Sequence, residues 1–116
     1  MIHRMRDFQE EVTGLPGAEI VRKALGLSVT DLIQITGKTE SHWRKVETGV
    51  TNCSMPIADR VAAFMCCTVD DLRRDQLSEL KLVDIRISFL HKRLAEAQAE
   101  RVGIINCIQD KKAGAA

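Results

Sequence analysis

Four polar side chains, two of them basic, fall on one side of a short helical stretch near the middle of the chain. They are Glu40, Ser41, Arg44 and Lys45. Trp43 and Val46 are spaced i and i+3 and point to the opposite side. A carboxylate, a hydroxyl and two cations on one face can exchange hydrogen bonds with a polar or charged partner. The alternative is an ordinary solvated helix face, with Trp43 and Val46 in the core.

No residue pattern in the chain indicates catalysis or metal binding. Ser/His/Asp, Cys/His and paired-carboxylate arrangements do not stand out, and there is no glycine-rich phosphate loop. The four cysteines form no Cys-x-x-Cys pair and have no histidine at metal spacing. We expect buried free thiols, with a metal site as the less favoured alternative. We therefore expect no enzyme activity, cofactor, metal or small-molecule ligand.

The stretch Leu25–Gly49 positions these polar side chains. It reads as two short amphipathic helices, Val29–Thr36 and Thr39–Thr48, joined by a tight turn. Gly37 permits the left-handed backbone that a sharp turn requires. This is the pattern of a helix-turn-helix. Its predicted inner side consists of Leu32, Ile33, Trp43 and Val46.

Three further helices surround this pair in the predicted domain, residues 17–76. One begins near Pro16, which suits the first helical position. Another follows Ser54 with Pro56 in its first turn, and the last starts at the capping-box pair Thr68 and Asp71. Five helices with short connections predict an all-α domain.

Residues 1–16 precede this domain and begin with the basic run MIHRMR. The run is either a disordered start or an arm that contacts nucleic acid, and we favour the former. Phe8 and Val12 are spaced i and i+4, which predicts a short leading helix that ends at Gly14.

Residues 77–116 have a different pattern, in which apolar positions step by three and four. The steps predict one long helix with an apolar coiled-coil seam. Arg101 puts a charge at one seam position, and Gly103 weakens the helix beside it. Leu82, Ile85 and Phe89 form a second stripe off this seam. We expect the second stripe to pack on the domain and the seam to form a dimer; the alternative is an intramolecular hairpin. The seam comprises Leu80, Val83, Ile87, Leu90, Leu94, Ala97, Ile104 and Ile108.

Composition limits the class of protein without naming a partner. The chain has 116 residues, 28% charged and 45% apolar, and a formal net charge of only +1. Bulk charge therefore does not indicate nucleic acid, so DNA binding would depend on locally placed cations. No apolar run is long enough for a membrane span, and no signal region is evident, so we expect a cytoplasmic, nucleoid-associated protein.

The segment Ile20–Leu72 resembles the Cro/repressor (Xre-like) helix-turn-helix family. This segment makes up a little under half of the chain. The resemblance is carried by Arg22, Leu27-Ser28, Leu32, Gly37, Trp43 with Val46, Glu47-x-Gly49 and the run VDDL at 69–72. The sequence around Trp43 is also similar to a subgroup of this family that keeps a tryptophan in the recognition helix. This subgroup includes autoregulatory repressors of mobile elements and phages, among them anti-CRISPR-associated regulators. The resemblance implies a five-helix DNA-binding domain, followed here by the long helix.

The family resemblance also implies a role for individual residues. Arg22 would pair with Glu47 and join the first helix to the third. Lys45 would donate to guanine, and Glu40 would accept from the N4 amine of cytosine. His42 is either a solvated residue or a phosphate contact. The full set implied to contact DNA is Ser28, Lys38, Thr39, Glu40, Ser41, His42, Arg44, Lys45, Thr48, Thr51 and Asn52.

Two positions depart from the family pattern. Val29 stands where many members have a glutamine that binds phosphate, and Ile33 stands where a small alanine is usual between the two helices. Ile33 is expected to alter the angle or spacing of the helix pair.

Together these features predict a homodimeric, sequence-specific DNA-binding transcriptional regulator. It would act as a repressor, with one recognition helix per subunit in the major groove of an inverted-repeat operator. The alternative is a protein-interaction module, an antitoxin or adaptor, whose long C-terminal helix binds a partner protein.

Overall fold

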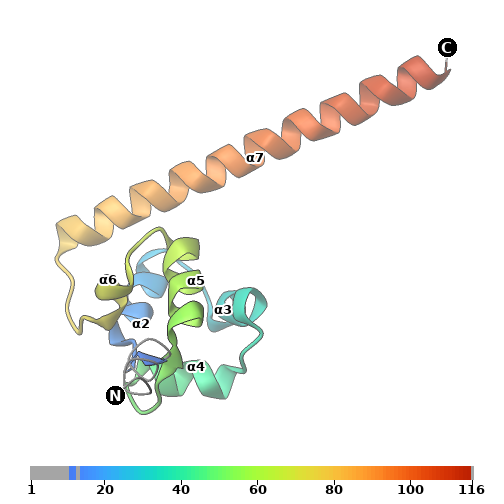
Figure 1. Ribbon diagram of the computed structural model, residues 1–116. Helices are drawn as coiled ribbons and strands as arrows, with labels where there is room; N and C mark the ends of the chain where they lie inside the picture. Colours follow the sequence, from blue (N-terminus) through green and yellow to red (C-terminus); the bar gives the residue numbers. More distant parts are fainter. Residues whose placement is uncertain (1–10, 13, 116) are drawn as a thin grey trace, which may run out of the picture.

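Six helices account for most of the residues that the computed structural model describes, which are residues 11–12 and 14–115 (Figure 1). Five are short: α2 (Pro16–Ala24), α3 (Val29–Thr36), α4 (Glu40–Glu47), α5 (Met55–Met65) and α6 (Val69–Arg73). The sixth is α7 (Glu79–Ala115), 37 residues long. The predictions of five short helices and of a long C-terminal helix are confirmed.

The helices begin where local side chains satisfy the free backbone donors of a helix N-terminus. At α3 the Ser28 amide donates to Asp31 Oδ2 at 2.8 Å. At α4 the Thr39 hydroxyl accepts from the His42 amide at 3.1 Å. At α6 the amide of Thr68 donates to Asp71, and the amide of Asp71 donates to the Thr68 hydroxyl. These contacts confirm the predicted starts of all three helices.

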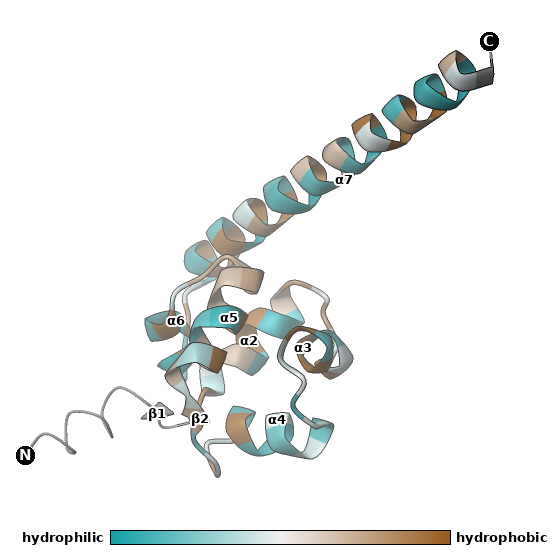
Figure 2. Ribbon diagram, turned by 45° about the vertical axis from the view of Figure 1, so that its right-hand side comes forward, coloured by the Kyte–Doolittle hydropathy of each residue, from teal (hydrophilic) through white to brown (hydrophobic). Residues whose placement is uncertain are grey.

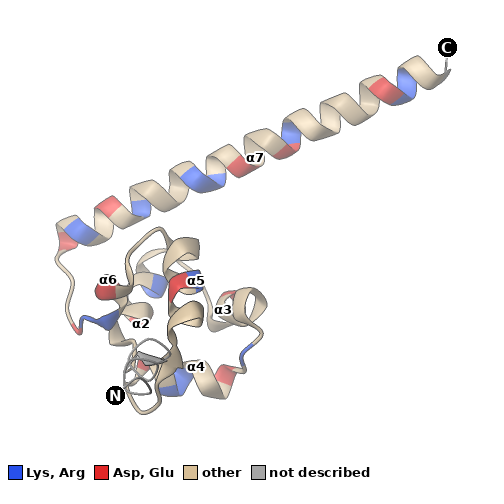
Figure 3. Cartoon of the chain, in the orientation of Figure 1, with Lys and Arg blue, Asp and Glu red and all other residues tan. Residues whose placement is uncertain are grey.

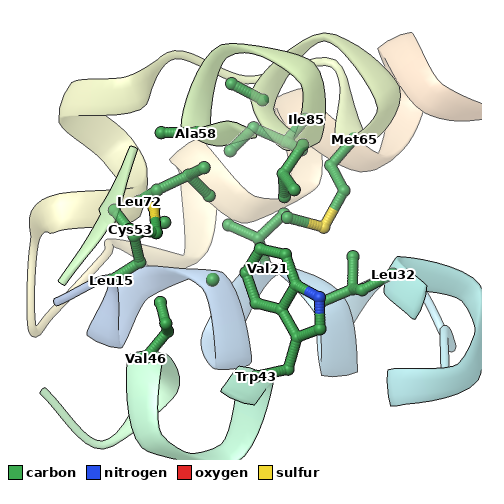
Figure 4. Close-up of a cluster of buried hydrophobic side chains, with 13 residues drawn as sticks. Leu15, Val21, Leu32, Trp43, Val46, Cys53, Ala58, Met65, Leu72 and Ile85 are labelled. Atoms are coloured by element: carbon green, nitrogen blue, oxygen red, sulfur yellow. The ribbon is translucent and has the colours of Figure 1, made fainter. Parts of the chain in front are cut away.

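The core lies between α2, α3, α4 and α5 and is closed by α6 and the start of α7 (Figure 4). Trp43 is its largest fully buried side chain and rises from α4 toward Val21 and Leu32. Its complete burial confirms that it is a core residue. Gly17 permits close packing of α2 on α6, because a Cβ there would collide with the carbonyl oxygen of Asp71.

The prediction of a short leading helix is wrong for residues 11–12, which the structure describes. Glu11 and Val12 form strand β1, which pairs antiparallel with β2 (Cys53–Ser54). The pairing joins residues about 40 positions apart, so a local i,i+4 pattern could not reveal it. Phe8 and the MIHRMR run lie outside the described residues.

The first turns of α7 lie across the domain, and the rest of the helix extends beyond it (Figures 1 and 2). Ile85 and Phe89 are buried and Leu82 is half-buried, which confirms that this stripe packs on the domain. The ring of Phe89 meets the ring of Phe64 edge-on at 6.0 Å. The Lys92 amine donates to the carbonyl oxygens of Ala63 and Phe64, near the C-terminal end of α5.

Beyond Lys92 the helix continues without a break to Ala115. It passes through Gly103 as regular helix and includes the run KKAGA at residues 111–115. The intramolecular hairpin is wrong, because α7 is one helix and its seam residues remain exposed.

Candidate nucleic-acid interface

Helix α4 lies at the end of the domain furthest from α7 (Figures 1 and 2). Its inner side is fixed, because Trp43 and Val46 are fully buried and Glu47 is 5% exposed. Its outer side carries the four predicted polar side chains, all exposed, around one shallow depression. The structure thus brings together Glu40, Ser41, Arg44 and Lys45.

The predicted ion pair between Arg22 and Glu47 is confirmed and is bidentate. Arg22 Nε donates to Glu47 Oε2 at 2.8 Å, and Nη2 donates to Oε1 at 3.1 Å. Arg22 Nη1 also donates to the carbonyl oxygen of Leu27, which ties the loop before α3 to the same group. The carboxylate raises the pKa of the Arg22 guanidinium through this hydrogen bond. The paired Glu47 charge therefore faces α2 and not the outer side of α4.

The Thr36 hydroxyl, which the sequence analysis did not single out, fixes the turn between α3 and α4. It donates to the Leu32 carbonyl oxygen at 2.6 Å and accepts from Trp43 Nε1 at 3.1 Å. It also accepts from the Lys38 amide at 3.3 Å. One side chain thus joins the last turn of α3, the connecting turn and the buried indole of α4. The sequence signal was a threonine directly before the turn glycine, with a tryptophan in the next helix.

Within the outer face of α4, Arg44 already has an ionic partner. Arg44 Nη2 lies 2.6 Å from Glu40 Oε1, and Arg44 Nε donates to the same oxygen at 3.0 Å. The i,i+4 spacing of the two residues was the signal for this contact. Both side chains are more than half exposed, so the pair is weak and can exchange with another partner. In this arrangement Glu40 Oε1 is engaged by Arg44 and is not a free acceptor for cytosine.

Two cations and one hydroxyl near α4 have no ionic or hydrogen-bonding side-chain partner among the described residues. Lys45 and Ser41 project from α4 itself, and Lys38 lies in the preceding turn. Figure 3 shows the basic residues in this turn and on α4. These groups are available to an external anion or base edge without breaking a contact.

The remaining predicted contacts are less available. The amide and hydroxyl of Ser28 both donate to Asp31 Oδ2, so neither of these donors is free for a DNA phosphate. The Thr48 hydroxyl donates to the carbonyl oxygens of Arg44 and Lys45, and the Thr51 amide donates to that of Lys45. Asn52 is exposed beyond α4.

His42 carries no extra positive charge into this surface at neutral pH. Burial lowers the pKa of its imidazole, and the nearby Lys38 charge lowers it further. Its Nε2 atom is buried without a hydrogen-bond partner among the described residues, and its ring meets Trp43 edge-on. It therefore lies partly inside the helix pair, which disfavours a fully solvated His42.

The four cysteines are free thiols in the structure, but only Cys53 is buried and Cys107 is exposed. The expectation of buried thiols was therefore wrong for Cys107, which lies on the part of α7 that extends beyond the domain. Burial raises the pKa of the Cys53 thiol to about 11, and burial with the charge of Asp71 raises that of Cys67 to about 12.

Comparisons with known proteins assign no family: no protein-family model, no curated protein and no solved structure matches the chain. The resemblance to the Cro/repressor family therefore stays a prediction from the sequence. In the described part of the chain no three His, Cys, Asp or Glu side chains gather as a metal site would require. Among the same residues no helix is both long and apolar enough to cross a bilayer.

Proposed function

We propose that this protein is a sequence-specific DNA-binding transcriptional regulator of the Cro/repressor type. Each subunit of a homodimer would insert α4 into a major groove, and the pair would bind an inverted-repeat operator and act as a repressor. The observation that carries the proposal is the asymmetry of α4. Its inner side is locked to the core by Trp43, Val46 and Glu47, while Ser41 and Lys45 on its outer side have no side-chain partner among the described residues.

The chemistry of the outer face suits the grooves of DNA. A lysine can donate to the O6 and N7 atoms of guanine, and a serine can donate to or accept from any base. Lys38 is close enough in sequence to track a neighbouring phosphate. Local placement of this kind compensates for the small net charge of the whole chain.

The proposal is tested by removing the two cations of α4. The Arg44→Ala/Lys45→Ala double variant should bind a selected operator at least about 10-fold more weakly, since a good base contact is worth about 1–3 kcal/mol. Arg60→Ala/Arg73→Ala removes the same charge from exposed positions on α5 and α6, outside both α4 and the seam of α7, and is the matched control. Fluorescence anisotropy at fixed salt measures both. Equal losses in the two variants would show that α4 does not read the DNA.

A second candidate function is favoured by the apolar seam of α7. Its large side chains are 48–72% exposed, and seven such residues lie along one helix. Such a surface also suits a protein-interaction module, an antitoxin or adaptor, in which α7 binds a different protein. A DNA reader shows steeply salt-dependent binding to an inverted repeat, whereas an adaptor binds DNA without preference and forms a tight complex with its partner.

A further inference from the structure

The seam of α7 is a long apolar surface that the described chain leaves uncovered. The domain contacts the other side of the helix, through Ile85, Phe89 and Lys92. Seam residues from Leu80 to Ile108 therefore face outward over about 28 residues, or about 42 Å of helix. Figure 2 shows apolar segments recurring along the whole of this helix.

We propose that α7 pairs with α7 of a second copy of the chain in antiparallel orientation, with Leu94 of one helix facing Ala97 of the other. The inference deepens the homodimer of the proposed function and rests on it. It names the orientation and register of the pair, which the heptad spacing alone leaves open.

Arg101 argues against a parallel pair. It occupies a seam position, so a parallel pair in register would place the two Arg101 side chains against each other. Two guanidinium groups facing each other in a desolvated layer repel, and no described carboxylate pairs with them. In the antiparallel register each Arg101 instead faces Leu90 of the second copy. The two guanidinium groups then lie about 16 Å apart along the rod, and each can lay its stem on the leucine and keep its charge in water.

The charges that flank the seam also favour an antiparallel pair over a parallel one. In a parallel pair the flanking contacts would join Glu79 to Asp84, two carboxylates, and Arg86 to His91. In the antiparallel register Arg93 of each copy faces Glu100 of the other, which gives two attractive pairs by symmetry. Glu100 has no cation three or four residues away on its own helix. Arg93 rests over the ring of Phe89 at 5.7 Å and forms no ion pair with a described residue.

Other antiparallel registers are worse. Moving the two-fold axis by one heptad toward the N-terminal ends of the helices joins Glu79 to Glu100 and Arg86 to Arg93, both repulsive. Moving the axis by half a heptad, which slides one helix past the other by about seven residues, joins Arg86 to Glu100 but sets Arg93 against Arg93 across the axis. Among these registers, only the one proposed here pairs the seam from Val83 to Ile108 without a like-charge pair among these flanking residues; it sets Leu80 against Lys111. Figure 3 shows the positive and negative residues distributed along α7.

This register places the two domains on opposite sides of the two-fold axis. Each domain sits near Ile85 to Lys92, and the two-fold axis passes between Leu94 and Ala97. The centres of the two contact regions are then separated by about 14 residues, or about 21 Å along the rod, before any sideways offset is added. The two α4 helices are thus held apart by a rigid spacer and not by a flexible linker.

Distances between spin labels test the orientation. The full chain with Cys66→Asn and Cys107→Ser serves as background, because the raised pKa values of Cys53 and Cys67 keep those thiols protonated. A label at Gln109→Cys should lie about 40 Å from its copy in the antiparallel pair and below about 25 Å in a parallel one. A label at Glu96→Cys lies close to the axis and should give a short distance in either case, which makes it the control.

Each outcome decides the proposal. A short distance at position 96 with a long one at 109 supports it, and short distances at both positions overturn it in favour of a parallel pair. A dimer mass without a short distance at 96 overturns the register. A monomer mass at tens of micromolar overturns the dimer of the proposed function as well, while DNA selection tests α4 independently.

A charge swap gives a second measurement. Arg93→Glu and Glu100→Arg should each weaken dimerisation several-fold, and the double variant should restore it, because the two charges meet only in the antiparallel register. Glu96→Arg changes a charge on the outer side of the same helix and is the matched control. Failure of the double variant to restore dimerisation would contradict the register.

Discussion

Replacing Thr36 by valine should destabilise the protein although the two side chains have nearly the same shape. The Thr36 hydroxyl is the acceptor for Trp43 Nε1, and the indole belongs to a residue with no exposed surface. The other two contacts of this hydroxyl matter less. Lys38 is exposed and its amide can turn to water, and the Leu32 carbonyl keeps its helical backbone bond. The loss therefore falls on one buried N–H group.

Leaving such a donor without an acceptor costs about 1–3 kcal/mol. In a protein of this size about 2 kcal/mol lowers Tm by roughly 10 °C. The single tryptophan of the chain is both the affected residue and the fluorescent probe, so urea unfolding followed by its emission reads the site directly. Wild type and variant are compared at one protein concentration, because a dimer makes stability concentration-dependent.

Two controls separate the hydrogen bond from other effects. Thr36→Ser keeps the hydroxyl and should retain most of the stability. Thr48→Val removes an exposed hydroxyl that bonds back to its own helix and should change the free energy of unfolding by less than about 0.5 kcal/mol. Unchanged stability in Thr36→Val would show that the indole finds another acceptor and that the turn is not held in this way.

Three further perturbations have defined outcomes. Glu47→Ala should cost about 3–5 kcal/mol in urea unfolding, since it leaves the largely buried Arg22 charge unpaired; a loss like that of an exposed residue would contradict the structural role of the pair. Burial alone would raise the pKa of Asp71, but hydrogen bonds from Thr68 and the charges of Lys81 and Arg74 make the net shift downward. Its contribution to stability is therefore present above its ordinary pKa of 3.8 and lost as the pH falls through the lower folded value. The stability gap between wild type and Asp71→Asn should shrink in urea titrations from pH 6 to pH 2, and a constant gap would refute the assignment. Glu40→Gln releases Arg44 and should strengthen binding to unrelated DNA several-fold at low salt; weaker binding would indicate that Glu40 itself contacts bases.

Local chemistry explains how much of the fold was predictable. The starts of α3, α4 and α6 followed from Ser28, Thr39 and Thr68, because a capping side chain bonds to residues two or three positions away. The division of α7 into a packed stripe and an open seam followed from helical periodicity, which records which residues share a face.

Contacts between distant residues were not predictable in the same way. The pairing of Glu11 with Ser54 depends on where the chain returns after α4, and the contact of Lys92 with the end of α5 depends on how α7 docks. The hydrogen bond between Thr36 and Trp43 depends on the angle between two helices. Periodicity assigns the tryptophan to the core but does not say which group its N–H meets.

The residues of the polar face of α4 were predicted from the sequence. Which of their polar groups already have a partner was not. The sequence placed Glu40, Arg44 and Lys45 together and predicted that all three contact DNA. The structure distinguishes them, because Glu40 pairs with Arg44, whereas Lys45 has no partner among the described residues. The same holds for Ser28, whose donors are used by Asp31. Side-chain availability depends on neighbours that share the same exposed surface.

Selection of bound sequences from random double-stranded DNA tests the proposed function most directly. If α4 reads the major groove from a two-fold symmetric dimer, the wild-type protein should enrich an inverted repeat with half-sites a whole number of helical turns apart, about 34 Å or a multiple. The Arg44→Ala/Lys45→Ala variant should lose that enrichment, and Arg60→Ala/Arg73→Ala should keep it. If the wild-type protein enriches no sequence at all, α4 is not a recognition helix, and the seam of α7 becomes the functional surface.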